Sequence, residues 1–230
     1  MDMWDLVNGS NPDVVKKVFV FRHGSCTNFP ERVYTCWSPD RELTEKGKAQ
    51  MRAAATKFDS LLDNVVLFAC SVLPRAGQSL CQMMLALGRS AKELDDIGYA
   101  LQLWSMEPEI WCTESQDPVD LTVAAVYKRS PEAVKSDGKS VLDFCRQMAG
   151  AIEPGQSALC VSHGGPVDAA LAMAEYEIHK DGQLAQNFRL DDIFARAKDL
   201  ETAEGVIFGF SESNELLQVV RTSQLVEQPA

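Results

Sequence analysis

Two of the three histidines in this 230-residue chain stand in short polar clusters that directly follow apolar runs. His23 lies between Arg22 and Gly24 after the apolar residues 18–21, and His163 stands before two glycines at the end of another such run. A neutral imidazole can attack phosphorus and hold the phosphoryl group covalently, which divides one displacement into two easier ones. Arginine stays charged at any working pH, and its planar fork of donors matches phosphate oxygens. These residue types therefore favour phosphoryl chemistry.

A third cluster follows the apolar run 64–70 and contains Ser71 and Arg75. If the three apolar runs are parallel strands of one sheet, their carboxyl ends lie at one edge, where α/β proteins place their ligands. Two histidines and two arginines then converge there. The helices that we expect after residues 73 and 163 add free backbone N–H groups, which bind anions.

The order of the apolar runs indicates which elements hold these clusters in place. We expect strands at 16–21, 64–70, 97–104 and 156–162, helices at 43–62, 74–88, 138–152 and 165–176, and a C-terminal hairpin of 205–210 with 215–221. This alternation is typical of an α/β fold, a three-layer sandwich whose mainly parallel central sheet has helices on both faces. The length suits a single domain over residues 1–230, with a helical insertion at about residues 106–137. The hairpin should add an antiparallel strand.

The composition argues against several classes of function. A net charge of −11 disfavours a general affinity for nucleic acid or for an anionic membrane. No apolar run is long enough to span a bilayer, and the acidic start lacks the features of a secretory signal. The seven cysteines are scattered, without a zinc-like spacing, and only three histidines occur, so we expect neither a metal nor another cofactor. We expect a reduced, cytoplasmic protein.

Four stretches of the chain together resemble the motifs of a known family. They are FRHGSCTN, LTEKGKAQ, SVLPRAGQS and VSHGGPV, and they occur in that family's order. On these residues the chain is identified as a member of the histidine phosphatase superfamily, whose fold is called phosphoglycerate mutase-like. The resemblance implies that His23 is the phosphate-accepting nucleophile. It also implies that Arg22 and Arg75 hold the phosphate, and that His163 binds and stabilises it.

The chain departs from the family pattern just after the first histidine. Ser25 and Cys26 follow the RHG signature where the family usually has an acidic residue and a threonine. Asn28 is one residue closer to the nucleophile than the family's asparagine. We take Ser25, Asn28 and Gly164 as candidate substrate-binding residues.

The expected proton donor is also displaced from its usual place. The family's donor is commonly a glutamate in an L-x-E segment, and YALQLW at the corresponding place contains no carboxylate. Glu107 and Glu109 follow shortly after it, whereas Asp95 and Asp96 come shortly before it. We select Glu107 as the candidate donor, with Glu109 next, because both follow a strand that should end near the site.

The expected function is a phosphatase that hydrolyses a small phosphomonoester through a phosphohistidine on His23. Two alternatives stay open: a phosphoglycerate mutase-type phosphotransferase, and a binding protein that keeps the anion pocket without turnover. Residues 26–32 match the C-x5-R spacing of cysteine phosphatases, but Pro30 has no N–H for a phosphate-binding loop. Four basic residues could bind a second anionic group of the substrate: Arg32, Arg41, Lys128 and Arg129.

Overall fold

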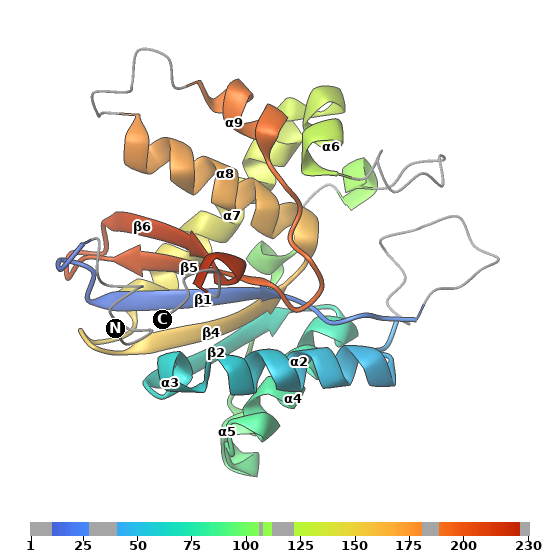
Figure 1. The fold of residues 1–230 in the computed structure, drawn as a ribbon, viewed down its shortest axis with the longest axis vertical. Coiled ribbons are helices and arrows are strands. Elements are labelled where there is room, and N and C mark those ends of the chain that lie inside the picture. The colour runs from blue at the N-terminus through green and yellow to red at the C-terminus, as the bar shows by residue number, and fades with distance from the viewer. Residues whose placement is uncertain (1–10, 28–40, 106–107, 112–121, 181–188, 226–230) are drawn as a thin grey trace.

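A computed structural model describes residues 11–27, 41–105, 108–111, 122–180 and 189–225, and of residues 91, 108 and 109 it describes the backbone only. Its centre is a six-stranded sheet in the order β3-β2-β4-β1-β5-β6 (Figure 1). β3, β2, β4 and β1 run parallel, β5 is antiparallel to β1, and β6 is antiparallel to β5. The strands are β1 (Lys16–Arg22), β2 (Val65–Ser71), β3 (Gly98–Ala100), β4 (Ser157–Ser162), β5 (Gly205–Phe210) and β6 (Leu216–Arg221).

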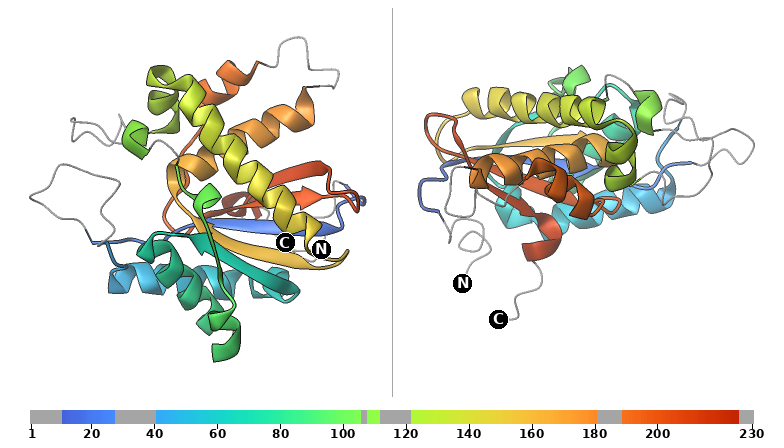
Figure 2. Two further views of the ribbon diagram at one scale, coloured as in Figure 1. Left: turned by 180° about the vertical axis from the view of Figure 1, so that it is seen from behind. Right: turned by 90° about the horizontal axis from the view of Figure 1, so that it is seen from above.

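Helices cover both faces of this sheet, as the two views of Figure 2 show. α2, α3 and α4 pack on one face, and α7 and α8 on the other, with α6 and α9 packed outside α8. The chain therefore has the expected α/β fold with a three-layer arrangement. The helices are α2 (Glu45–Lys57), α3 (Asp59–Leu62), α4 (Pro74–Ala86), α5 (Ala91–Asp95), α6 (Val123–Arg129), α7 (Pro131–Gly150), α8 (Gly164–His179) and α9 (Leu190–Arg196), with short 3-10 turns η1 (Leu101–Leu103), η2 (Pro108–Trp111) and η5 (Thr222–Leu225).

Strand β1 is buried on both faces, which explains its unbroken apolar sequence. Phe19 and Phe21 point into the core beneath α2 and α4, whereas Val18 and Val20 point into the core beneath α7 and α8. All four side chains are fully inaccessible to solvent. The end of β1 is therefore held rigidly between the two helical layers.

The helix expected at 43–62 begins as the sequence predicts but is broken once. Thr44 caps α2, because its hydroxyl accepts a hydrogen bond from the N–H of Gly47 at 3.0 Å. Phe58 leaves the helical conformation, with φ of −109° and ψ of 18°, and its buried ring lies 6.1 Å from the ring of Phe21. This bend turns Leu61 into the core. One expected helix thus becomes α2 and α3.

Two further boundaries differ from the sequence-based expectations. The strand expected at 97–104 is limited to β3, because the chain turns into η1, which exposes Leu101 and buries Leu103. The helix expected at 138–152 begins earlier, at Pro131, since proline favours the first turn of a helix. Residues 131–137, which we expected within the insertion, therefore belong to α7.

The C-terminal hairpin forms as expected. β5 and β6 pair antiparallel, and the turn between them contains Asn214 with a φ of 65°, a left-handed conformation that asparagine adopts more readily than most residues. Within the part of the chain that the structure describes, no helix is long and apolar enough to cross a membrane.

Candidate active site

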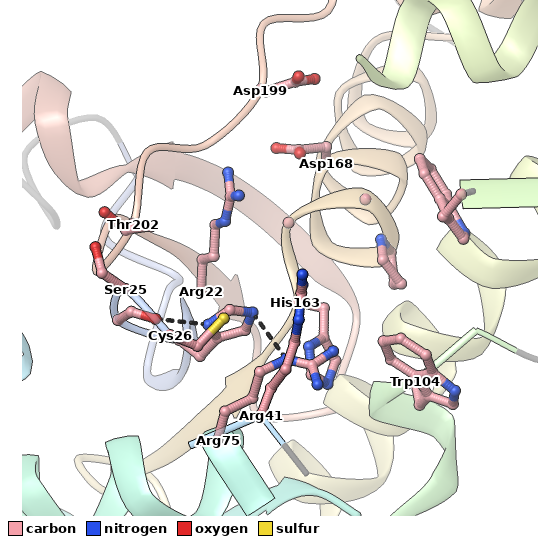
Figure 3. Close-up of a pocket in the computed structure, with 16 residues that line it drawn as sticks. Arg22, Ser25, Cys26, Arg41, Arg75, Trp104, His163, Asp168, Asp199 and Thr202 are labelled. Atoms are coloured by element: carbon pink, nitrogen blue, oxygen red, sulfur yellow. Dashed lines mark hydrogen bonds between the residues drawn. The ribbon is translucent and has the colours of Figure 1, made fainter. Parts of the chain in front are cut away.

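The carboxyl ends of β1, β2 and β4 open into one cavity of about 490 Å³ (Figure 3). β4 pairs in parallel with both β1 and β2, so the residues that follow these three strands meet at one edge of the sheet. The cavity is lined by Arg22, His23, Gly24, Ser25, Cys26, Arg41, Arg75, Trp104, Trp111, His163, Gly164, Gly165, Pro166, Asp168, Asp199 and Thr202. The structure therefore brings together Arg22, His23, Arg75 and His163.

The imidazole of His23 is fixed in one orientation. Its Nδ1–H donates to the carbonyl oxygen of Gly24 at 2.7 Å, which leaves the lone pair on Nε2. Nε2 in turn accepts a hydrogen bond from Nε of Arg75 at 3.2 Å. Burial lowers the pKa of His23 to about 3, and the nearby charge of Arg75 contributes to this shift. At neutral pH the ring is therefore uncharged, and the lone pair on Nε2 faces a cation.

His163 stands at the N-cap of α8, and its ring centroid lies 5.1 Å from that of His23. Its Nε2 is 2.8 Å from Oγ of Ser71, whereas Nδ1 is buried without a hydrogen-bond partner among the described residues. Burial lowers the pKa of His163 well below its ordinary value. If Ser71 donates its hydroxyl proton to Nε2, the ring carries its own proton on Nδ1. A buried donor then faces no protein acceptor, as an anion site requires.

Arg75 belongs to the first turn of α4 and is almost fully buried. Its guanidinium carbon lies 5.5 Å from the centroid of the Trp104 ring. The centroids of the Trp104 and His163 rings are 4.3 Å apart, and the two rings are nearly perpendicular. One turn further along α4, the Ser79 hydroxyl donates to the Arg75 carbonyl at 2.7 Å and accepts from the Gly24 N–H at 3.2 Å. This hydroxyl couples the start of α4 to the loop that carries His23.

Arg22 points in a different direction from Arg75. Its Nη1 donates to the carbonyl oxygen of Leu200, and its head group is directed toward Asp168 and Asp199 (Figure 3). The guanidinium packs flat against Gly164, where an added Cβ would lie 3.1 Å from the Arg22 Cζ. Nε of Arg22 is buried and has no hydrogen-bond partner within the described parts of the chain.

The remaining candidates fall into three groups. Ser25 lines the cavity, and its backbone N–H donates to the side chain of Gln50 at 2.9 Å. Arg41 lines the cavity too, whereas Lys128 and Arg129 do not. Four candidates give no structural information: Asn28, Arg32 and Glu107 lie outside the described residues, and Glu109 is described only by its backbone in η2.

Sequence reasoning missed two carboxyl groups that line the cavity, those of Asp168 and Asp199. Burial raises the pKa of Asp168 well above its ordinary value, and the charge of Asp199 adds to this shift. Burial also raises the pKa of Asp199. Helical spacing could have indicated Asp168, which stands one turn after Gly164. No sequence pattern indicates Asp199, because it lies in an irregular segment that is far in sequence from the three strand ends.

A model of the histidine phosphatase superfamily, branch 1, matches residues 18–191 of this chain. That span contains all three strand ends that line the cavity. The chain belongs to the histidine phosphatase superfamily. Among curated protein sequences, none matches this superfamily member significantly.

Several solved structures share the fold of this histidine phosphatase family member. A mycobacterial glucosyl-3-phosphoglycerate phosphatase, in complex with VO3, has a TM-score of 0.57 at 16% identity, over 90% of this chain and 97% of its own. The protein histidine phosphatase SixA, in complex with tungstate, has a TM-score of 0.53 at 14% identity, over 91% and 99%. A mutant phosphoserine phosphatase from Entamoeba histolytica, in complex with phosphoserine, has a TM-score of 0.51 at 15% identity, over 92% and 99%. At these identities the likeness concerns the fold.

Proposed function

We propose that this protein is a phosphatase that hydrolyses a small phosphomonoester through a phosphohistidine on His23. The observation that carries the proposal is the state of His23, an uncharged ring locked by Gly24 with Nε2 turned to Arg75. An uncharged, half-buried imidazole beside a guanidinium suits attack on a phosphoryl group, whose negative charge needs nearby cations. The names of the similar structures agree with this reaction class.

The first chemical step would transfer the phosphoryl group to His23. Substrate oxygens replace Nε2 of His23 as the hydrogen-bond acceptor for Arg75. Nε of Arg22 and Nδ1 of His163 bind the remaining phosphoryl oxygens. Both nitrogens are buried and have no protein partner among the described residues. The lone pair of Nε2 forms the P–N bond as the bond between phosphorus and the leaving oxygen breaks. The leaving oxygen takes a proton from the donor, for which we propose Glu107, with Glu109 next.

The second step would return the enzyme to its starting state. A water molecule attacks phosphorus, the P–N bond breaks, and its electron pair returns to Nε2. The proton of that water passes to the carboxylate that acted as donor, and inorganic phosphate leaves. A mutase shares the first step, but it passes the phosphoryl group to a substrate hydroxyl instead of to water. The fate of the phosphoenzyme therefore distinguishes a phosphatase from a mutase.

The test compares the wild-type protein with His23→Ala and with His179→Ala, a matched control at the end of α8 that does not line the cavity. Brief reaction with a ³²P-labelled phosphomonoester should label the wild type and His179→Ala in an acid-labile, alkali-stable form. His23→Ala should lose the label and roughly 10³-fold or more of kcat/KM for p-nitrophenyl phosphate. Undiminished turnover by His23→Ala would exclude the proposal. Return of the label to a second substrate hydroxyl instead of water would identify a mutase.

A further inference from the structure

An irregular segment, residues 197–204, runs from α9 past α8 to β5 and borders the cavity (Figure 1). We call it the strap. The backbone of Leu200 in the strap connects two cavity side chains that are far apart in sequence. Its carbonyl oxygen accepts from Nη1 of Arg22, and its N–H donates to Oδ1 of Asp168 at 2.8 Å. The position of the Arg22 head group therefore depends on the bond between the strap and Asp168.

Asp168 is well placed to hold this connection rigidly. Its side chain is only 2% exposed, and it projects from the second turn of α8. Gly164, in the first turn of the same helix, supports the flat face of the Arg22 guanidinium. α8 thus provides both the surface on which Arg22 lies and the carboxyl group that holds its acceptor.

The strap is also held at several other points. Near β5 it pairs with the Arg22 backbone, because the Ala203 N–H donates to the Arg22 carbonyl at 3.2 Å and the Glu204 carbonyl accepts from the Arg22 N–H at 2.8 Å. The Asp199 side chain accepts from the N–H of Val123 at the start of α6 at 2.8 Å. Arg221 of β6 donates to the carbonyl oxygen of Lys198. Thr202 accepts from the Gln50 side chain of α2 at 3.0 Å. With both ends of the strap held, the bond between Leu200 and Asp168 determines how its middle meets Arg22.

This arrangement determines which edge of Arg22 can bind a ligand. One N–H of Nη1 is used by Leu200, so we expect a ligand to meet the edge formed by Nε and Nη2. Two parallel N–H donors on one guanidinium edge match two oxygens of a phosphate. The Nε of this edge is the buried atom without a partner among the described residues. A rotation of the head group away from this edge would take the buried Nε out of reach of the ligand.

We propose that Asp168 is a positioning residue, which acts through the Leu200 backbone to keep the Nε and Nη2 edge of Arg22 turned toward the phosphoryl group. The inference rests on the proposed function insofar as that function places a phosphoryl group beside Arg22. A carboxylate in direct contact with phosphate would repel it, whereas one placed behind the arginine does not compete for the same donors.

The decisive experiment is a double-mutant cycle between Asp168 and Arg22, with inorganic phosphate as the ligand. Its affinity is measured by titration calorimetry for the wild type, Asp168→Leu, Arg22→Ala and the double variant. Asp168→Leu should weaken phosphate binding roughly tenfold, and it should add less than about twofold in the Arg22→Ala background, because coupled residues are not additive. Asp168→Asn keeps an oxygen that can accept a hydrogen bond from the Leu200 N–H, so it should retain most of the affinity for phosphate. If Asp168→Leu does not fold, this variant still tests the proposal.

The matched control is Asp143→Leu, which replaces a partly exposed aspartate on α7 that pairs with Lys139 and Arg146. It should leave phosphate affinity unchanged. Equal losses from Asp168→Leu with and without Arg22 would overturn the inference, as would an Asp168→Asn variant as weak as Asp168→Leu. A selective loss of kcat/KM for alkyl over aryl phosphates would make Asp168 a proton donor, and would overturn it too. Wild-type protein that fails to bind phosphate contradicts the proposed function itself, whereas binding without coupling contradicts only this inference.

Discussion

His23 and His163 show how burial prepares two side chains of one type for different tasks. His163 is buried and His23 is half-buried, and the loss of solvent lowers both pKa values, so both rings are neutral at neutral pH. Their hydrogen bonds differ: a carbonyl oxygen holds the proton of His23 on Nδ1, whereas a hydroxyl group faces Nε2 of His163. The first ring therefore presents a lone pair to the cavity, and the second can present a proton.

This difference leads to a prediction about pH. The folded protein disfavours protonation of His23, whose pKa is lowered to about 3, so the ring should stay neutral from pH 8 down to pH 5. In NMR spectra, the imidazole signals that are lost in His23→Gln should not titrate over this range. The same chain unfolded in urea provides the control, since its histidines should titrate near the ordinary value of about 6.5. A midpoint near 6.5 in the folded protein would contradict the neutral-nucleophile mechanism.

Helix α2 contributes to the site because its backbone packs closely against the loop that follows His23. It places no side chain among those that line the cavity. Gly24 and Gly47 lie against each other: a Cβ on Gly47 would lie 2.0 Å from the carbonyl oxygen of Ser25, and one on Gly24 would lie 2.5 Å from the carbonyl oxygen of Gly47. The Ser25 carbonyl also accepts from the backbone N–H of Thr44 at 3.0 Å. The glycine of the LTEKG stretch therefore lets α2 support the His23 loop.

At the scale of this element we predict that Gly47→Ala displaces the loop. It should destabilise the protein by roughly 1–3 kcal/mol, the usual cost of overpacking, and lower kcat/KM because His23 moves relative to Arg75. Gly77→Ala is the matched control, since its Cβ would meet other atoms no closer than 3.7 Å inside α4. It should stabilise the protein by about 0.5–1 kcal/mol through helix propensity. Urea unfolding of both variants gives the comparison, and similar stabilities for the two would refute the packing argument.

At the scale of the whole molecule, a lysine in the core should make the stability depend on pH. Lys17 of β1 is 2% exposed, and the alternation of the strand puts it on the same face as Phe19 and Phe21, the face that α2, α3 and α4 cover. Burial lowers the pKa of Lys17 to about 7. Between that value and about 10.4, the ordinary lysine pKa, the unfolded chain binds more protons than the folded one, so stability should rise with pH.

We therefore predict that Lys17→Met stabilises the molecule at pH 7 by at least about 1.4 kcal/mol, the equivalent of one pKa unit. The variant should also lose most of the gain in stability between pH 7 and pH 9.5. Guanidinium unfolding at both pH values measures the two effects. Lys48→Met, on the solvent side of α2 where Lys48 pairs with Glu45, should change stability by less than about 0.5 kcal/mol. If Lys17→Met were less stable than the wild type at pH 7, the buried amine of Lys17 would stabilise the fold, and the prediction would be wrong.

The amino-acid sequence by itself determined the fold class and the place of the site. The apolar runs that became β1, β2 and β4 form strands that are buried on both faces, except near the start of β2, where Val66 is exposed. This apolar pattern is local. Parallel strands end at one edge, so the convergence of His23, Arg75 and His163 could be inferred without coordinates. The catalytic roles of these residues stay predictions.

Only the tertiary structure decided how the site is held. Three contacts join segments that are distant in the chain. Arg22 donates to Leu200, Leu200 donates to Asp168, and Gly24 packs against Gly47. Phe58 breaks a continuous helical pattern for the same reason, because its ring packs on Phe21 of β1. A periodic pattern reports which face of an element is buried, but not which partner it meets. Orientation, unlike secondary structure, is therefore set when the layers pack together.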